Sequence, residues 1–295
     1  MIALLVSLLS VQTQSDNAVM ELDLTECLAR CEWAGHHLAR LREAIRNYEQ
    51  SDPYSIRTDF DSRAYTSSVY ITPKPMPLAI SFMAGDVVHN LHSALDHFAW
   101  QLALAIDPHG PTFPLEDDPD GASWRWLFFP LRSKADDSDN WLPERLRGAS
   151  DDTKAFLRDV QPFAAADNPR DATVWKLQEL SKADKHRVPL IAVPSLYQTD
   201  TLTITTPFSR VNSRIMRLVR VPHMLEGETL LVRVGYNTVP LSKPIVELQH
   251  AITVAFHDRL GIGPGMPVID MLDMMEAMVE YILTRARRIG ENGTN

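Results

Sequence analysis

The sequence has few cysteines, and this shortage excludes a disulfide framework. Only Cys27 and Cys31 occur in the 295 residues, one helical turn apart. Both lie on the apolar side of a predicted helix, and we interpret them as reduced core residues rather than as a redox or metal pair. Unpaired cysteines are typical of a reducing compartment, so we expect the protein in the cytoplasm.

The chain also lacks a long apolar run. A membrane-spanning helix needs about 18 or more consecutive apolar residues, and no segment reaches this length. The N-terminal stretch MIALLVSLLS is shorter and has no Lys or Arg before it. We expect residues 1–19 to be a non-structural extension before a start at Met20, with a cleaved signal peptide as the alternative.

Positive charge is scarce as well. The formal net charge is −9, which argues against a surface that coats nucleic acid generally, although a local basic patch stays open. The 12 glycines are fewer than the 20 prolines, and hydrophobic residues make up 45% of the chain. This composition is typical of a folded globular protein and not of a disordered or fibrous one.

Apolar residues at helical spacing predict long helices. The first helix is expected over residues 24–50, with these residues on one face: Leu24, Leu28, Cys31, Leu38, Leu41, Ile45 and Tyr48. Further helices are expected over residues 78–106, in two pieces within 150–185, and over 267–289. The last of them returns to the helical layer.

Strand-like alternation appears in two regions. Residues 54–72 predict a β-hairpin that turns near Asp61 and Ser62. Five further strands are expected at 188–193, 201–206, 215–221, 229–235 and 245–256. Because no helix separates them, they predict one antiparallel sheet of about five strands within residues 188–258. The expected fold is α+β, with one domain over residues 20–295 whose helical part is 20–187 and 267–289.

The segment GDVVHNLHSALDHFAWQL, residues 85–102, concentrates the polar residues that can carry chemistry. At about 100° per residue, its apolar side chains share one face: Val87, Val88, Leu91, Leu95, Phe98 and Leu102. His89, His92 and Asp96 lie on the opposite face, with His97 beside them. Trp100 also lies in this polar arc, which suggests that another part of the chain covers it.

Three interpretations of this polar face stay open. It can be the solvated side of an amphipathic helix. It can bind a divalent metal through His89, His92 and Asp96, since imidazole and carboxylate groups one and two turns apart can converge on one ion. Alternatively, His92 and His97 can act as a general acid and base on a phosphodiester.

A second polar stretch, Asp184 to Arg187, closes the helix before the strands. Cations near a helix C-terminus interact favourably with the helix dipole, so a structural role is one interpretation. The other is that Asp184 and His186 complete a site begun by His89 and His92.

Four ordered motifs resemble a widespread family of uncharacterised bacterial proteins. They are GDVVHNLHSALDHFAWQL, TFPL at 112–115, DVQPF at 159–163 and LQELSKADKHR at 177–187. The resemblance covers about residues 24–260 and implies a shared fold, but it implies no activity.

The same helix faintly resembles the HEPN superfamily of helical ribonucleases and toxins. That signature has an Arg with a His four to six positions later. In HSALDH the Arg position is His92, so only His97 of the pair is kept. The guanidinium expected to hold the scissile phosphate is therefore missing.

The sequence is compatible with two functions. The first is a non-catalytic binding or accessory module. The second is a HEPN-like or metal-assisted hydrolase that acts on RNA or a nucleotide through residues 89–97. A homodimer and a divalent metal cofactor are compatible with either function.

Overall fold

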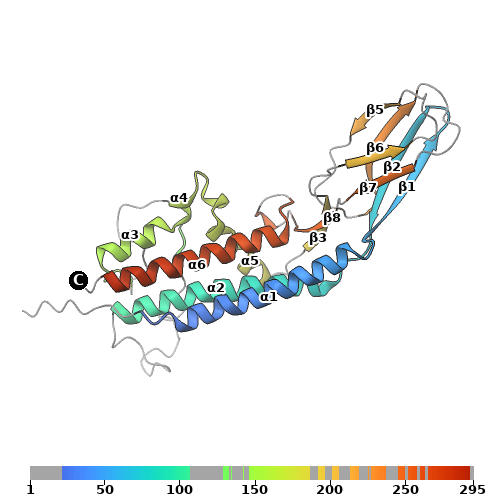
Figure 1. Cartoon of the computed structure of the whole chain (residues 1–295). Coiled ribbons are helices and arrows are strands. Elements are labelled where there is room, and N and C mark those ends of the chain that lie inside the picture. The colour runs from blue at the N-terminus through green and yellow to red at the C-terminus, as the bar shows by residue number, and fades with distance from the viewer. Residues whose placement is uncertain are drawn as a thin grey trace, which may run out of the picture.

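The computed structural model describes most of the helical part and the paired strands. These are residues 22–106, 129–132, 134, 142, 146–186, 192–196, 201–205, 213–218, 225, 227–236, 245–249, 252–257, 260–262 and 265–292. Helices occupy one end of the molecule and a β-sheet projects beyond them (Figure 1). The α+β class predicted from the sequence is confirmed.

Four helices form the main bundle. They are α1 (Thr25–Glu49), α2 (Leu78–Ile106), α5 (Thr173–His186) and α6 (Val268–Asn292). Helix α2 packs against α1, α5 and α6, and α6 also contacts α1 and α5. The expected helices at 24–50, 78–106 and 267–289 are thereby confirmed to within a few residues. The region 150–185 contains α3 (Asp151–Asp159), the short α4 (Pro162–Ala165), a 3₁₀ turn (Pro169–Asp171) and α5.

Helix α1 buries most of the apolar face that the sequence predicted for it. Cys27, Cys31, Leu38, Leu41 and Ile45 recur at helical spacing and are all buried. Burial raises the pKa of the Cys27 thiol to about 11 and that of the Cys31 thiol to about 12, so both are neutral core side chains. Both cysteines are free.

Leu28 is the exception among the residues predicted for this buried face. Its side chain is 42% exposed. Cys27, one residue earlier, is buried instead. The prediction that Leu28 is a core residue was therefore wrong.

The projecting sheet has four antiparallel strands. The hairpin β1 (Tyr54–Asp61) and β2 (Thr66–Pro73) turns where the sequence predicted, and β2 then pairs with β6 (Thr229–Tyr236). Strand β5 (Ser213–Leu218) adds to the other edge of β6, which gives the order β1-β2-β6-β5.

The remaining strands form two separate pairs. Strand β3 (Ala192–Leu196) pairs with β8 (Ile252–Phe256), and β4 (Thr201–Thr205) pairs with β7 (Ile245–Gln249). Four residues join β3 to β4, but only two join β7 to β8. The expected single strand over 245–256 is two strands with different partners, since β7 pairs with β4 and β8 with β3.

The prediction of a single five-stranded sheet was also wrong. The strands after residue 188 divide between the four-stranded sheet and the two pairs, and the earlier hairpin supplies half of the larger sheet. The period of a strand shows that it is extended, but it does not show which distant strand it will meet.

Two clusters of buried apolar side chains lie within the described part of the chain. The larger one lies among the helices and includes Val254 and Phe256 of β8. The smaller one lies in the sheet, around Val69, Val232 and Val234. Strand β8 thus anchors the strand region in the helical core, whereas a single domain over residues 20–295 stays a prediction.

The aromatic centre of the helical core gives a test of the fold. Phe98 of α2 is fully buried and its ring centroid lies 6.0 Å from that of Phe129 and 6.2 Å from that of Phe156. We expect Phe98→Ala to lower the free energy of unfolding by about 3–5 kcal/mol, because it leaves a cavity. Urea denaturation measures this loss.

A matched control lies on the same helix. Phe82 is 50% exposed, so Phe82→Ala removes an aromatic ring without creating an internal cavity. We expect a cost below about 1 kcal/mol for this variant. Equal losses for the two variants would show that Phe98 is not in a closed core.

Candidate functional site

The polar face of α2 lies opposite the helical core, as its sequence predicts. All six apolar residues assigned to the core face are buried. His89 is exposed, while His92, Asp96 and His97 are partly buried. Side chains of α1 and α5 lie near this face, Glu26 beside His97 and Arg30 and Lys185 near His89.

His92 and Asp96 form a close imidazole–carboxylate pair. Nδ1 of His92 lies 3.0 Å from Oδ2 of Asp96, and only 14% of the His92 side chain is exposed. This nitrogen is buried and has no aligned hydrogen bond with any residue of the described chain, so the carboxylate contact is electrostatic. The other oxygen of Asp96 accepts a hydrogen bond from the backbone N–H of Phe129 at 3.1 Å, which fixes the carboxylate.

His97 has a different partner. Its Nδ1 lies 3.3 Å from Oε2 of Glu26 on α1. The two histidines predicted to act as an acid–base pair are therefore each paired with a separate carboxylate. Glu26 was not predicted from the sequence, because the approach of α1 to α2 is not a local property.

His89 lies in a different electrostatic environment. Partial burial, together with the positive charges of Lys185 on α5 and Arg30 on α1, lowers the pKa of its imidazole, and Asp184 opposes this effect. Arg30 also donates a hydrogen bond of 3.4 Å to the side-chain oxygen of Asn90. His89 is therefore favoured as a neutral imidazole between two cations.

Asp184 packs directly on Gly85. A Cβ atom at residue 85 would lie 2.8 Å from Oδ1 and 3.2 Å from Cγ of Asp184. Asp184 thus meets the start of the segment 85–102, which brings it to the His89 end of the face rather than to His97. His186 ends α5, and its side chain lies outside the described residues.

The predicted metal ligands are not brought together. Among the residues that the structure describes, no group of three or more His, Cys, Asp or Glu side chains could hold a metal ion. His92 and Asp96 face each other, whereas His89 interacts with the charged groups of α1 and α5. Helical spacing places the three residues on one face, but it does not make their side chains converge.

A second FPL sequence, at residues 129–131, lies against the QPF motif. The fully buried Gln161 of the QPF motif holds these residues in place. Its side-chain amide donates to the carbonyls of Pro130 (2.8 Å) and Leu157 (2.9 Å), and its oxygen accepts from the backbone N–H of Arg132 (2.9 Å). The FPL expected from the resemblance, at residues 112–115, lies outside the described residues. The contact between residues 129–131 and Gln161 was not predicted from the sequence, because it joins residues 31 positions apart.

An aromatic cluster borders the face on α1. The Trp33 ring makes edge contacts with the rings of His36 and His37, at centroid distances of 5.8 and 5.6 Å. His37 Nδ1 lies 3.8 Å from Oδ2 of Asp86 on α2. This cluster was not predicted from the sequence, although the spacing of Trp33 and His37 by four residues was a visible signal.

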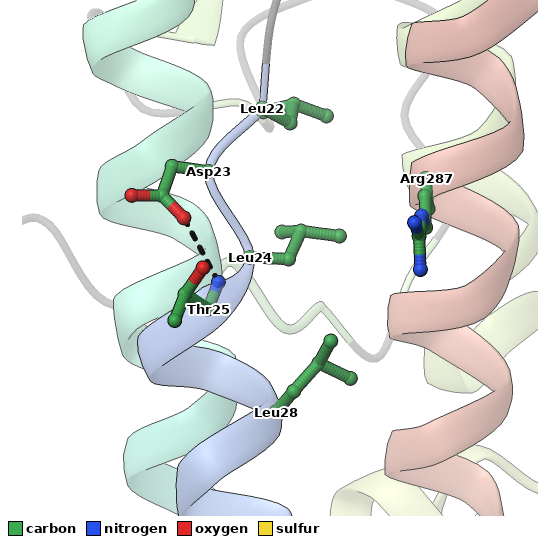
Figure 2. Close-up of a pocket in the computed structure, with 6 residues that line it drawn as sticks. All are labelled: Leu22, Asp23, Leu24, Thr25, Leu28 and Arg287. Carbon is green, nitrogen blue, oxygen red and sulfur yellow. Dashed lines mark hydrogen bonds between the residues drawn. The ribbon is translucent and has the colours of Figure 1, made fainter.

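One pocket lies at the end of the bundle where α1 begins. It has a volume of about 500 Å³ and is lined by Leu22, Asp23, Leu24, Thr25, Leu28 and Arg287. Figure 2 shows the three leucines extending toward α6, which carries Arg287 on the facing side. The backbone N–H of Thr25 donates to the carboxylate of Asp23 at 3.0 Å. The exposed side of Leu28 thus belongs to a partly apolar pocket.

A second pocket lies near the opposite end of α1. Its volume is about 510 Å³, and it is lined by Arg42, Ile45, Arg46, Glu49, Thr253, Pro267, Ile269 and Asp270. Residues of α1, β8 and the start of α6 therefore share it. Both pockets lie away from the His92–Asp96 pair.

Comparisons with known proteins give no further information on this site. No family model, no curated protein and no solved structure matches the chain. The resemblances to the bacterial family and to the HEPN superfamily therefore stay predictions. In addition, no helix in the described part of the chain is long and apolar enough to cross a membrane.

The contact between Gly85 and Asp184 can be tested by adding a methyl group. Replacing a helical glycine with alanine is intrinsically favourable by about 1 kcal/mol. At residue 85 the new Cβ would displace the whole Asp184 carboxyl group. We therefore expect Gly85→Ala to lower the melting temperature, and Gly85→Ala combined with Asp184→Ala to be at least as stable as Asp184→Ala alone.

Gly35 provides the matched control on α1. A Cβ there would meet only Oε1 of Glu276, at 2.9 Å, which is the end of a longer and more flexible side chain. We expect Gly35→Ala to retain or raise the melting temperature. If Gly85→Ala and Gly35→Ala behave alike, the close approach of α5 to α2 is incorrect.

The lowered pKa of His89 predicts a pH dependence of stability. The unfolded chain has an ordinary histidine there, with a pKa of 6.5, so it binds more protons than the folded protein as the pH falls below this value. Protonation thus favours unfolding. We expect His89→Gln to lose less unfolding free energy than the wild type between about pH 7.5 and about pH 5.5, measured by urea denaturation.

His36 is exposed on α1 and serves as the control for this measurement. His36→Gln should follow the wild-type pH dependence. A His89→Gln curve parallel to that of the wild type would contradict the environment assigned to His89.

Proposed function

We propose that the protein is a non-catalytic binding module. The observation that carries this proposal is the pair of partly apolar pockets of about 500 and about 510 Å³, one at each end of α1 and each with arginine in its lining. Small-molecule sites typically have volumes of about 300–1,000 Å³ and combine apolar walls with a few polar groups. Both pockets are of this kind.

The partners of the α2 histidines support a structural role for its polar face. His97 is paired with Glu26 of α1, and His92 with Asp96, which is bound in turn to the backbone of Phe129. These contacts attach α1 and residues 129–132 to α2. In this proposal the face stabilises the scaffold, and ligands bind at the pockets.

A second candidate is a hydrolase that acts on RNA or a nucleotide. The His92–Asp96 contact favours it, because a carboxylate beside Nδ1 can orient an imidazole for general base catalysis at Nε2. Arg30 of α1 and Lys185 of α5, near His89, supply positive charge suited to a phosphate. The HEPN resemblance points to the same reaction but lacks the Arg at residue 92, and the metal-assisted form has no support in the contacts of His89, His92 and Asp96.

The two unpaired and buried cysteines support a reducing location, and we propose the cytoplasm. A homodimer stays a prediction from the sequence. Nucleic acid is a partner only under the second candidate, since the chain carries a net negative charge.

Cleavage of single-stranded RNA separates the two functions. A binding module should show no cleavage above the buffer blank, and His92→Ala should not differ from the wild type. Under the second candidate, His92→Ala should reduce cleavage by at least about 100-fold, because it removes the general base.

His36→Ala is the control, since His36 is exposed and lies outside the His92–Asp96 pair. Melting curves of all three proteins should be compared, so that loss of activity is not confused with loss of the fold. Cleavage that persists in His36→Ala and disappears in folded His92→Ala would overturn the binding module.

A further inference from the structure

The pocket between α1, β8 and α6 contains an arginine that has no side-chain partner among the described residues. Arg42 and Arg46 lie one turn apart on α1, and both line the pocket. Arg42 forms an ion pair with Asp273 of α6. The Arg46 guanidinium makes no ion pair or hydrogen bond with any residue of the described chain. One positive charge is therefore available to a ligand.

Glu49, the carboxyl group of α1 that lines the pocket, contacts strand β8. Glu49 lies three residues after Arg46, and the side chain of Thr253 on β8 hydrogen-bonds to it. Burial raises the pKa of Glu49, which disfavours its charged form in the pocket. Glu49 is therefore a weak competitor for the Arg46 guanidinium.

The other acidic residue of the lining belongs to α6. Asp270 stands in the first turn of that helix, where the helix dipole stabilises a negative charge. Because Asp273 already neutralises Arg42, Asp270 offsets the charge of Arg46, and the lining is close to neutral. A ligand with one negative charge suits this balance better than one with several.

The remaining wall is apolar. Ile45 of α1 lines it together with Pro267 and Ile269 at the start of α6. Ile45 and Pro267 are buried, so the accessible aliphatic surface beside the charged groups comes mainly from the partly buried Ile269. This surface can contact the hydrocarbon part of a ligand.

We propose that this pocket binds a small monoanion with an apolar body, of the class of medium-chain carboxylates. The carboxylate contacts Arg46, and the hydrocarbon chain lies against Ile45 and Ile269. This assignment builds on the proposed binding module, because it names the class of ligand and one of the two pockets.

The position of the pocket gives such a ligand a structural effect. Strand β8 is attached to the start of α6 by a bridge between Ala255 and Pro267, and by a hydrogen bond of 3.4 Å from the Phe256 N–H to the Met266 carbonyl. Thr253, on the same strand, lines the pocket. A bound ligand therefore contacts the bundle and the strand pair together, and it stabilises their junction.

Isothermal titration calorimetry of the full chain tests this assignment with three probes. Octanoate supplies both parts of the ligand, octan-1-ol only the apolar part, and inorganic phosphate only the anion. We expect octanoate to bind the wild type. Its dissociation constant should rise about ten- to a hundredfold in Arg46→Gln, because a charge-assisted hydrogen bond is lost. Octan-1-ol and phosphate should each bind the wild type more weakly than octanoate.

Two control variants give the result its specificity. Arg40→Gln removes an exposed arginine of α1 that does not line the pocket, and Arg287→Gln removes the arginine of the other pocket. Both should bind octanoate like the wild type, and melting curves should show that all variants fold. Amide hydrogen exchange in β8 should also slow when octanoate is added, because the ligand contacts this strand.

Several results would contradict the assignment of a carboxylate to this pocket. Unchanged octanoate binding in Arg46→Gln, or octan-1-ol or phosphate binding as tightly as octanoate, overturns the assignment. Absence of octanoate binding to the wild type overturns it as well. If octanoate binding is lost only in Arg287→Gln, the ligand occupies the other pocket, which overturns the assignment to this one but leaves the proposed binding module intact. The binding module itself is overturned by RNA cleavage that depends on His92.

Discussion

The packing of α2 is the constraint on which the other contacts of the helical part depend. One face of this helix lies in the core with α1, α5 and α6, and Phe98 lies among other aromatic rings. A shift of one residue would rotate the helix by about 100° and bring polar side chains into the core. Burial therefore fixes the rotation of α2. That rotation in turn places Gly85 beneath Asp184 and Asp96 beside the Phe129 N–H.

The helices were predictable because their signal is local. Apolar residues three and four apart define the core face of α2, and its six assigned core residues are all buried. The pairing of strands has no such local signal. Residues 245–256 alternate throughout, yet they supply one strand to β4 and another to β3. Likewise, nothing in residues 66–73 indicates that β2 will pair with β6.

The candidate site shows the same limit at the level of single residues. His89, His92, Asp96 and His97 were found together because they share one helix. Their partners come from other elements: Glu26 from α1, Lys185 from α5 and the backbone N–H of Phe129. Since these contacts arise only after folding, the sequence predicted the face but not the pairs that form on it. The pockets were not predicted for the same reason, because residues of α1 and α6 meet in both.

The order of strands in the four-stranded sheet has a consequence for synthesis of the chain. Val69 of β2 pairs opposite Val232 of β6, about 160 residues further along. A ribosome adds about 5–20 residues per second, so the hairpin β1–β2 waits roughly 10–30 s before β6 has been made. During that time β2 has an open backbone edge, of the kind that pairs readily with strands of other chains. Strand β2 is therefore a site of association for the nascent protein until β6 adds to the sheet.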